Sequence, residues 1–405
     1  MRARDDGWRP GRVISLALFA LALLAGETAL GVLAYLLAWE LLGRDDVPGH
    51  RARALAPTMI LIGAYLVAYK IGGYGAWHSD GYVDPIHEPL AYARVAPARL
   101  LSLIGSFFIG PPSDVQLQTP QSLAWLWVVI GIVAVAGVTA LLRHVWPALD
   151  DGERRGLRWL IAGALASFAP SLGATVGGRL LIVPSLAGAA ISAILLVSAW
   201  RAGRNFTGGR PAFAVLVFAL AIRPALTLGA TMVMFREYAQ ALVHVARDSE
   251  LPTSPDVAVV APLMPDFIIG TYTPTVRVVD QHILPRAWWT LSLTRRDHLL
   301  TRTAEDRIEL TSLGGPMLRA PFERLYRSQS VPFQAGDKVE LKGMTVRILE
   351  VDNGAPTKIE ARFDRSVDDP GLWFVEWRDG LLRKLKVPAV GGSVKLEWKV
   401  GPFRI

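Results

Sequence analysis

Cysteine is absent from this chain of 405 residues. Disulfide bonds are therefore excluded, and so are zinc and iron–sulfur sites built on cysteine ligands. Several catalytic signatures are also missing: the sequence contains no Gly-x-Ser-x-Gly, no phosphate-binding loop, no dinucleotide fingerprint and no His-Glu-x-x-His. There is no internal repeat at a fixed period, which disfavours a transporter built from repeated halves. These absences remove the most easily recognised enzyme and transporter classes.

Charged residues are scarce, and the shortage lies in one part of the chain. They make up 19% of the sequence, whereas a soluble protein usually has about a quarter. Residues 13–235 hold few charges outside short loops, and residues 236–405 have an ordinary soluble composition. We therefore predict a multi-pass α-helical membrane domain followed by a soluble, mostly-β C-terminal region. The formal net charge of +8 does not indicate a nucleic-acid partner, because the arginines lie in short loops between apolar runs.

Apolar runs divide the first 235 residues into six or seven predicted spans. The runs are 13–42, 54–71, 122–142, 157–172, 179–200 and 212–235. At about 1.5 Å per residue the first run would be about 45 Å long, more than the roughly 30 Å of hydrocarbon in a bilayer. It is either one strongly tilted helix or a hairpin broken at Gly26–Glu27. The fourteen residues Pro97–Gly110 are too few to cross, which predicts an interfacial or re-entrant helix.

Short arginine-rich loops predict the orientation. By the positive-inside rule, loops 43–53, 143–156 and 201–211 are cytoplasmic. Loop 72–121 and everything after Phe235 are then extracytoplasmic. A hairpin in the first run would also leave the arginine-rich N-terminus in the cytoplasm. Every loop then obeys the rule, and this consistency favours the hairpin. The predicted membrane domain is thus 1–235.

A polar, aromatic segment, Gly72–Val95, separates two of the apolar runs. Within eleven residues it gathers the densest mixture of histidine and carboxylate in the first half of the chain: His78, Asp80, Asp84, His87 and Glu88. These side chains could bind a divalent cation or perform acid–base catalysis. Their spacing matches no strong metal signature, and prolines directly follow Asp84 and Glu88, which is equally typical of turns. The segment is either a site or a well-ordered loop.

Two charged residues lie well inside apolar runs, Glu27 in the first and Arg223 in the last. A charge at depth costs about 2.5–3.5 kcal/mol on insertion scales, so such residues usually serve a function. We expect Glu27 and Arg223 either to line a substrate cavity or to pair with each other across the bundle. Arg179, at the extracytoplasmic end of its span, would hold a lipid phosphate or anchor the helix at the interface.

The C-terminal region divides into a connecting α/β region, 236–330, and an antiparallel β module, 331–405. In the former we expect a short buried strand over Asp256–Pro262 and a helix over Pro265–Gln281. The module contains strand-like runs separated by turn pairs such as Asn353-Gly354: 338–341, 344–351, 358–364, 372–377, 381–387 and 393–400. Such alternation and punctuation predict a small antiparallel barrel or sandwich.

Several of these residues are similar to a known family. The Gly26-Glu27 break resembles a small–Glu feature of the GT-C type integral-membrane glycosyltransferases, the dolichyl-phosphate-mannose mannosyltransferase-like group. Three further stretches resemble uncharacterised bacterial membrane proteins related to that group: Ser79–Pro85, Arg179–Ala190, and the tail from Pro332–Asp337 through Phe363-Asp364. GT-C proteins also combine many spans with an extracytoplasmic C-terminal domain.

The resemblance implies transfer of a sugar from a polyprenyl-phosphate donor on the extracytoplasmic face of a bacterial inner (plasma) membrane. The implied catalytic residues are Asp84, Asp80 and His78, and the implied substrate-binding residues are Glu27, Arg179, Arg223, His87 and Glu88. GT-C enzymes carry their key acidic residues in a large external loop just after the first span, and this sequence departs from that pattern. Either an N-terminal catalytic portion is missing or the activity has been lost.

A non-enzymatic function is the alternative. The protein would then be a membrane scaffold whose extracytoplasmic β module binds an envelope protein or glycan. Membrane lipid is an expected partner under either interpretation.

Overall fold

The computed structural model describes residues 8–75, 78–202, 209–280, 283–320 and 322–403. The chain forms two compact units. The helical unit comprises residues 1–77 and 82–229, and the β unit comprises residues 230–405 together with the short segment 78–81. The predicted regions 236–330 and 331–405 thus belong to one unit. Much of the predicted cytoplasmic loop 201–211 lies outside the described residues.

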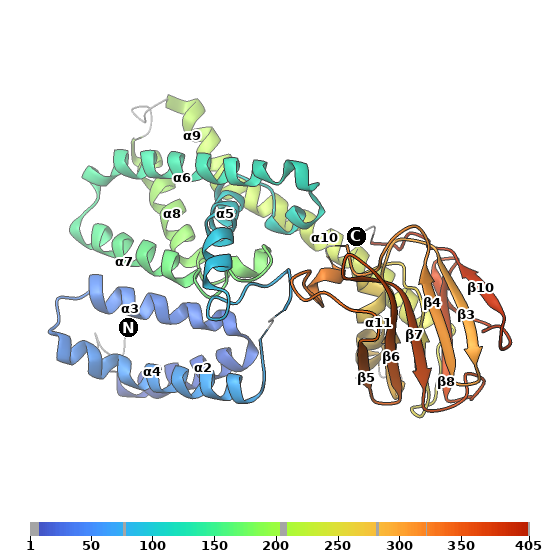
Figure 1. The fold of residues 1–405 in the computed structure, drawn as a ribbon. Helices are drawn as coiled ribbons and strands as arrows, with labels where there is room; N and C mark the ends of the chain where they lie inside the picture. Colours follow the sequence, from blue (N-terminus) through green and yellow to red (C-terminus); the bar gives the residue numbers. More distant parts are fainter. Residues whose placement is uncertain (1–7, 76–77, 203–208, 281–282, 321, 404–405) are drawn as a thin grey trace. The chain divides into compact units, whose positions relative to one another are not determined.

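The helical unit is built from helices joined by short loops and by three longer connections, 72–88, 109–124 and 168–184 (Figure 1). They are α2 (Arg9–Ala25), α3 (Gly31–Leu42), α4 (Pro48–Ile71), α5 (Pro89–Phe108), α6 (Trp125–Val145), α7 (Asp151–Ser167), α8 (Ser185–Ala202), α9 (Gly209–Val217) and α10 (Arg223–Asp248), which continues into the β unit. Within the described residues, four helical stretches are long and apolar enough to cross a membrane: Pro48–Ile71, Trp125–Ala148, Ser185–Ala202 and Pro211–Asp248. These lengths suggest a membrane protein, as the sequence predicted.

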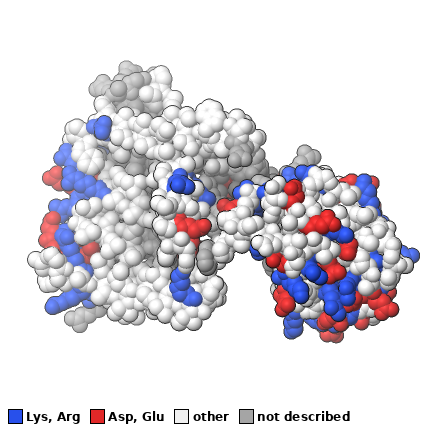
Figure 2. Space-filling model, in the orientation of Figure 1, with Lys and Arg blue, Asp and Glu red and all other residues white. Residues whose placement is uncertain are grey.

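The surface of the helical unit is also largely apolar. On the face drawn in Figure 2, its charged side chains gather near helix ends and a broad surface between them carries none, whereas both signs cover the β unit. Large apolar side chains are exposed on α4, including Ile60 (72% exposed) and Ile71 (82%). Because a large exposed apolar surface is unfavourable in water, this exposure also suggests a membrane protein.

The first apolar run is broken where the sequence predicted. Helix α2 ends at Ala25, and a short 3-10 turn, Glu27–Leu30, leads into α3. Phe19 and Leu23 of α2 pack with Ile62 of α4 in one apolar cluster. Two helices therefore replace the single tilted helix that was the other possibility.

The loops of the helical unit gather at two ends. Arg155 Nη1 lies 3.0 Å from Asp45 Oδ2, which brings the predicted cytoplasmic loops 43–53 and 143–156 together. Val83 N donates to Gly173 O at 2.8 Å, which brings the polar segment to the loop after α7. The two ends are separated by α4, whose 24 residues rise about 36 Å. This grouping agrees with the predicted topology.

Helix α5 is longer than predicted. It begins at Pro89, not Pro97, and has 20 residues. Pro89 occupies the first turn, where its missing N–H costs nothing, and residues 89–95 of the polar segment are therefore helical. Its interfacial or re-entrant placement remains a prediction.

Helices α5 and α6 touch through their backbones, crossing each other rather than running alongside (Figure 1). A Cβ added to Gly131 of α6 would overlap with Leu101 O, and one added to Gly105 of α5 would lie 2.7 Å from Gly131 N. Small residues permit such close approach between apolar helices. This crossing fixes the end of α5 against α6.

The β unit contains two sheets and the helix α11 (Phe267–Val279). The four-stranded sheet has the order β2 (Ala287–Thr290), β1 (Ala258–Ala261), β8 (Leu372–Arg378), β9 (Leu381–Lys384). The six-stranded sheet has the order β10 (Ser393–Leu396), β3 (His298–Ala304), β4 (Arg307–Ser312), β7 (Ala355–Phe363), β6 (Met344–Asp352), β5 (Lys338–Leu341). Residues from both sheets, including Val260, Leu300, Ile359 and Phe374, share one apolar core.

The sheets differ from the predicted module in how the strands are paired. The strand positions agree closely, but β1 pairs in parallel with β2 and with β8, so the region is not wholly antiparallel. The reason is that all four residues of β1 are buried, as is usual for a central parallel strand. Strands β8 and β9 consequently leave the other predicted strands and join a sheet with residues 258–290.

The glycine crossing yields a test of the helical unit. Gly131→Val should push α5 away from α6 and lower the stability of the full chain by roughly 1–3 kcal/mol, the usual cost of overpacking. Gly137→Val, on the same helix, is the control because its added Cβ would meet nothing within 4 Å. Thermal unfolding in lipid nanodiscs measures both. Equal melting temperatures for the two variants would show that the crossing does not depend on this contact.

Candidate functional site: a cavity in the β unit

The structure separates the residues predicted to be catalytic. His78 and Asp80 pack with the β unit, whereas Asp84 belongs to the helical unit. Asp80 Oδ2 accepts from Arg324 Nε at 2.5 Å, and Ser328 Oγ donates to Asp80 Oδ1. Burial raises the pKa of Asp80, but hydrogen bonds from Ser328 and Arg324 lower it by more, so the pKa lies below the ordinary aspartate value. His78, which has a left-handed φ of 65°, accepts Ser328 N through its carbonyl at 2.7 Å.

Asp84 organises a turn before α5. Its Oδ1 accepts from Ile86 N at 2.8 Å, and its Oδ2 lies 2.6 Å from His87 Nδ1. Burial raises the pKa of Asp84, while the hydrogen bonds from His87 and Ile86 outweigh that effect and lower it overall. Glu88 precedes α5, and its N–H donates to Asp84 O at 2.8 Å. These contacts match the turn interpretation of the segment.

No metal site is evident in the described part of the chain, where no group of three or more His, Asp or Glu residues could hold an ion. The expectation of a divalent cation therefore receives no support from this arrangement.

Glu27 and Arg179 lie near helix ends. Glu27 follows the break after α2 and its Oε2 accepts from Tyr69 Oη, near the end of α4, at 3.3 Å. The break thus places this carboxylate at a chain reversal and not midway along a continuous helix. Arg179 Nη2 donates to Tyr82 Oη at 3.2 Å, at the same end as Gly173.

Arg223 caps the carboxyl end of α5. Its guanidinium donates to Ser106 O at 3.3 Å, to Phe107 O at 2.6 Å and to Gly110 O. The last carbonyls of a helix lack partners within it and carry partial negative charge, so a cation there is favourable. Within the described residues Arg223 donates to these carbonyls and does not contact Glu27. The predicted ion pair between Glu27 and Arg223 is therefore not formed. A π-helical turn, Phe218–Ile222, precedes Arg223.

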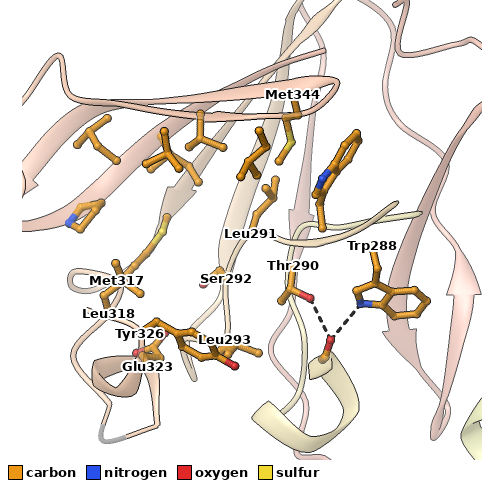
Figure 3. A pocket seen from close by; sticks show the side chains of 18 of the residues that line it. Trp288, Thr290, Leu291, Ser292, Leu293, Met317, Leu318, Glu323, Tyr326 and Met344 are labelled. Atoms are coloured by element: carbon orange, nitrogen blue, oxygen red, sulfur yellow. Dashed lines mark hydrogen bonds between the residues drawn. The ribbon is translucent and has the colours of Figure 1, made fainter. Parts of the chain in front are cut away.

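The β unit holds a cavity of about 540 Å³ that sequence analysis did not predict. Four segments line it: β2 with the residues after it, the start of α11, the strands β5 to β7, and the loop 313–333. Figure 3 shows Leu291, Met317 and Met344, from three of these segments, facing one space. The volume is within the range of ordinary small-molecule sites, about 300–1,000 Å³.

Pro274 helps to build one wall. It has no N–H to donate to the Gly270 carbonyl four residues earlier in α11. That carbonyl instead accepts from Trp288 Nε1 at 3.0 Å and from Thr290 Oγ1 at 3.3 Å (Figure 3). The two bonds hold β2 against α11 and satisfy a carbonyl that would otherwise reduce the apolar character of the wall.

Glu323 is the one formally charged residue among those that line the cavity in the described chain. It is 2% exposed, and its carboxylate is fully occupied. Thr294 Oγ1 donates to Oε1, while Arg319 N and Ala320 N donate to Oε2 at 3.1 and 2.9 Å. Glu323 therefore holds the loop in shape and offers no free charge to a ligand.

The cavity has a buried floor and an exposed rim. Met317, Met344 and Ile348 are each 3% exposed, whereas Leu341 is 45% and Tyr326 59% exposed. Tyr326 Oη lies 3.2 Å from Thr271 Oγ1 of α11. An apolar group can thus enter past an aromatic rim that also carries hydroxyl groups.

Comparison of the chain with protein-family models, with curated proteins and with solved structures found no match. The site must therefore be judged on its own chemistry.

A cavity of this kind is difficult to predict from a sequence. Trp288, Met344 and Ile348 occupy ordinary inward positions of alternating strands, and such a pattern is the same for a filled core and for a hollow one. The nearest signal is the proline within the apolar helix at 265–281, which predicts an unpaired carbonyl but not its neighbour.

Arg223 provides a test of the helical unit. Arg223→Met leaves two terminal carbonyls of α5 and the carbonyl of Gly110 without this donor, so the free energy of unfolding should fall by roughly 1–3 kcal/mol. Arg223→Lys keeps the positive charge but loses the planar guanidinium with its several donors. Its free energy of unfolding should lie between those of the wild type and Arg223→Met. Arg236→Met, at an exposed position on the same helix, is the control. Thermal unfolding of the full chain in nanodiscs measures all three. An Arg223→Met variant as stable as the control would contradict the capping role.

Proposed function

We propose that this protein is a membrane protein whose β unit binds the hydrocarbon chain of a membrane lipid on the extracytoplasmic side. The observation that carries the proposal is the cavity of about 540 Å³ with a floor of buried apolar side chains. A hydrocarbon chain gains about 0.8 kcal/mol for each methylene group removed from water, so a lining of this kind is sufficient to retain one.

The electrostatics of the wall supports an uncharged occupant. Burying an ionised group without a partner is costly, and the single carboxylate in the lining, Glu323, already accepts three hydrogen bonds. The hydroxyl groups of Tyr326 and Thr271 lie at the rim. We therefore place the chain of the lipid inside and its polar end at this rim.

The helical unit supports a membrane source for the ligand. Four described stretches are long and apolar enough to span a bilayer, which would keep the β unit beside a reservoir of acyl and isoprenoid chains. This function shares a non-catalytic role of the β unit with the scaffold interpretation, but its partner is a membrane lipid instead of an envelope protein or glycan.

Glycosyl transfer from a polyprenyl-phosphate sugar is the second proposal. The apolar cavity supports glycosyl transfer in one respect, because an isoprenoid chain is among the hydrocarbon chains that such a lining accepts. The catalytic role would fall to Asp84, whose carboxylate pairs with His87, because Asp80 is occupied by Arg324 and Ser328.

Photolabelling tests the lipid proposal. The full chain in vesicles is irradiated with a fatty alcohol or a farnesol that carries a diazirine, and the adducts are mapped by mass spectrometry. We expect adducts on cavity residues such as Met317 and Met344, and the relative yield of the two probes reports the preferred chain. Ile348→Trp should fill the cavity and reduce these adducts at least about tenfold, since excluding two methylenes costs about 1.6 kcal/mol.

The matched control is Arg347→Trp, at the exposed neighbouring position of β6, which should leave the yield unchanged. Leu341→Trp at the half-exposed rim should block entry without altering the buried core. Adducts confined to the helical unit, with none on the cavity lining, would reject the proposal. Protein–protein crosslinks from the rim would indicate a second copy or another protein as the occupant.

Transfer of a labelled sugar tests the second proposal. Asp84→Ala should lower transfer from a polyprenyl-phosphate sugar to an acceptor by roughly 10²–10⁴-fold if Asp84 is the general base. Asp256→Ala, at an exposed position in the β unit, should have no effect. Transfer that persists unchanged in Asp84→Ala membranes would remove the polar segment from the mechanism.

A further inference from the structure

The described residues of the loop 313–333 form one side of the cavity. Its residues Glu323 and Tyr326 line the space, and Tyr326 is its most exposed aromatic contact with α11. The Tyr326 ring packs at 6.0 Å from Phe267, and its hydroxyl lies 3.2 Å from Thr271 Oγ1. Among its described residues this part of the wall has no strand pairing, and its regular structure is a single 3-10 turn, Glu323–Leu325.

Other contacts fasten the two flanks of this loop. Arg319 Nη2 donates to Asn353 O at 2.7 Å, in the turn between β6 and β7. Arg327 lies over the Phe333 ring at 3.6 Å and donates to Val331 O at 2.8 Å. The stretch between these anchors carries Tyr326.

Asp80 fastens that stretch from far away in the sequence. Arg324 and Ser328 both donate to the Asp80 carboxylate. They lie two residues before and two residues after Tyr326. Gln329 N donates to Asp80 Oδ2 at 3.3 Å, and Asp80 N donates to Arg324 O at 3.1 Å. A charge-assisted network of this kind is stronger than neutral hydrogen bonds. It involves the segment 78–81, which packs with the β unit although it lies between α4 and α5 in the chain.

We propose that Asp80 is a positioning residue for the ligand: its carboxylate latches Arg324 and Ser328, keeps Tyr326 at the rim, and so retains a hydrocarbon chain in the cavity. The proposal rests on the proposed lipid-binding function. It gives the most polar part of the segment 72–95 a role that is neither catalytic nor metal binding. Release of the latch frees Tyr326 from α11 and opens a path for exit.

Two readouts test the latch in the full chain in nanodiscs. The first is hydrogen exchange, which needs no ligand. Asp80→Asn keeps the shape of the side chain and removes its charge, so amides at 324–331 should exchange roughly tenfold faster, as expected for a weakened charged hydrogen-bond network. Exchange in the strands of the six-stranded sheet should not change, because their ladder is untouched.

The second readout is the release of a bound dansyl-labelled fatty alcohol, chased with unlabelled vesicles. Asp80→Asn should accelerate release roughly tenfold, equivalent to about 1.4 kcal/mol. Asp306→Asn is the matched control, because Asp306 also pairs with an arginine of the β unit, at 2.9 Å from Arg362 Nε, away from the loop. Arg324→Met should reproduce the effect, and the double variant should add little, since both changes break one contact.

The outcomes separate the latch from the function on which it rests. Photolabelling of the wild-type cavity with unchanged release and exchange in Asp80→Asn overturns the latch alone. No labelling of the wild-type cavity overturns the lipid function, and the retention role with it, even if exchange at 324–331 rises. Faster exchange in the loop and in the strands together would show a general loss of stability and would also overturn the positioning role.

Discussion

Backbone carbonyls without a helical partner determine how both units are built. A buried carbonyl must find a donor, and side chains supply one at three places in the described part of this chain. Arg223 meets the terminal carbonyls of α5, and Arg99 meets those of Leu172 and Gly173 after α7. In the β unit, Trp288 and Thr290 meet the carbonyl that Pro274 leaves unpaired. The same requirement thus positions α5 and shapes the cavity wall.

Local patterns predicted the elements of the fold well. The alternating runs between 338 and 396 match β5 to β10 closely, and the Gly26–Glu27 break is where α2 stops. The parallel pairing of β1 was not predictable, because a buried run of four residues such as Ala258–Ala261 contains no information on its neighbours. Those partners lie at 287–290 and 372–374, and only the closure of the whole sheet selects them. Pairing across long separations is set by tertiary packing rather than by propensity.

The candidate site was less predictable, for a related physical reason. Charged residues attract attention in a sequence, and Asp80, Asp84 and Glu27 were therefore the natural choices. A carboxylate can serve structure as readily as chemistry, and the partner decides which. Nothing in the sequence marks Arg324 and Ser328 as the partners of Asp80. A cavity, in contrast, consists of the space that side chains fail to fill, and no residue type marks it.

The contact between Asp80 and Arg324 joins residues 244 positions apart. During synthesis the acidic partner leaves the ribosome long before its arginine exists, so Asp80 must wait for this contact until the β unit has been made as far as Arg324. Contacts of such separation form late, after local structure, because closing a long loop costs entropy before any contact repays it. The β unit thus includes a short piece of chain that is synthesised well before the rest of the unit and waits for its partners.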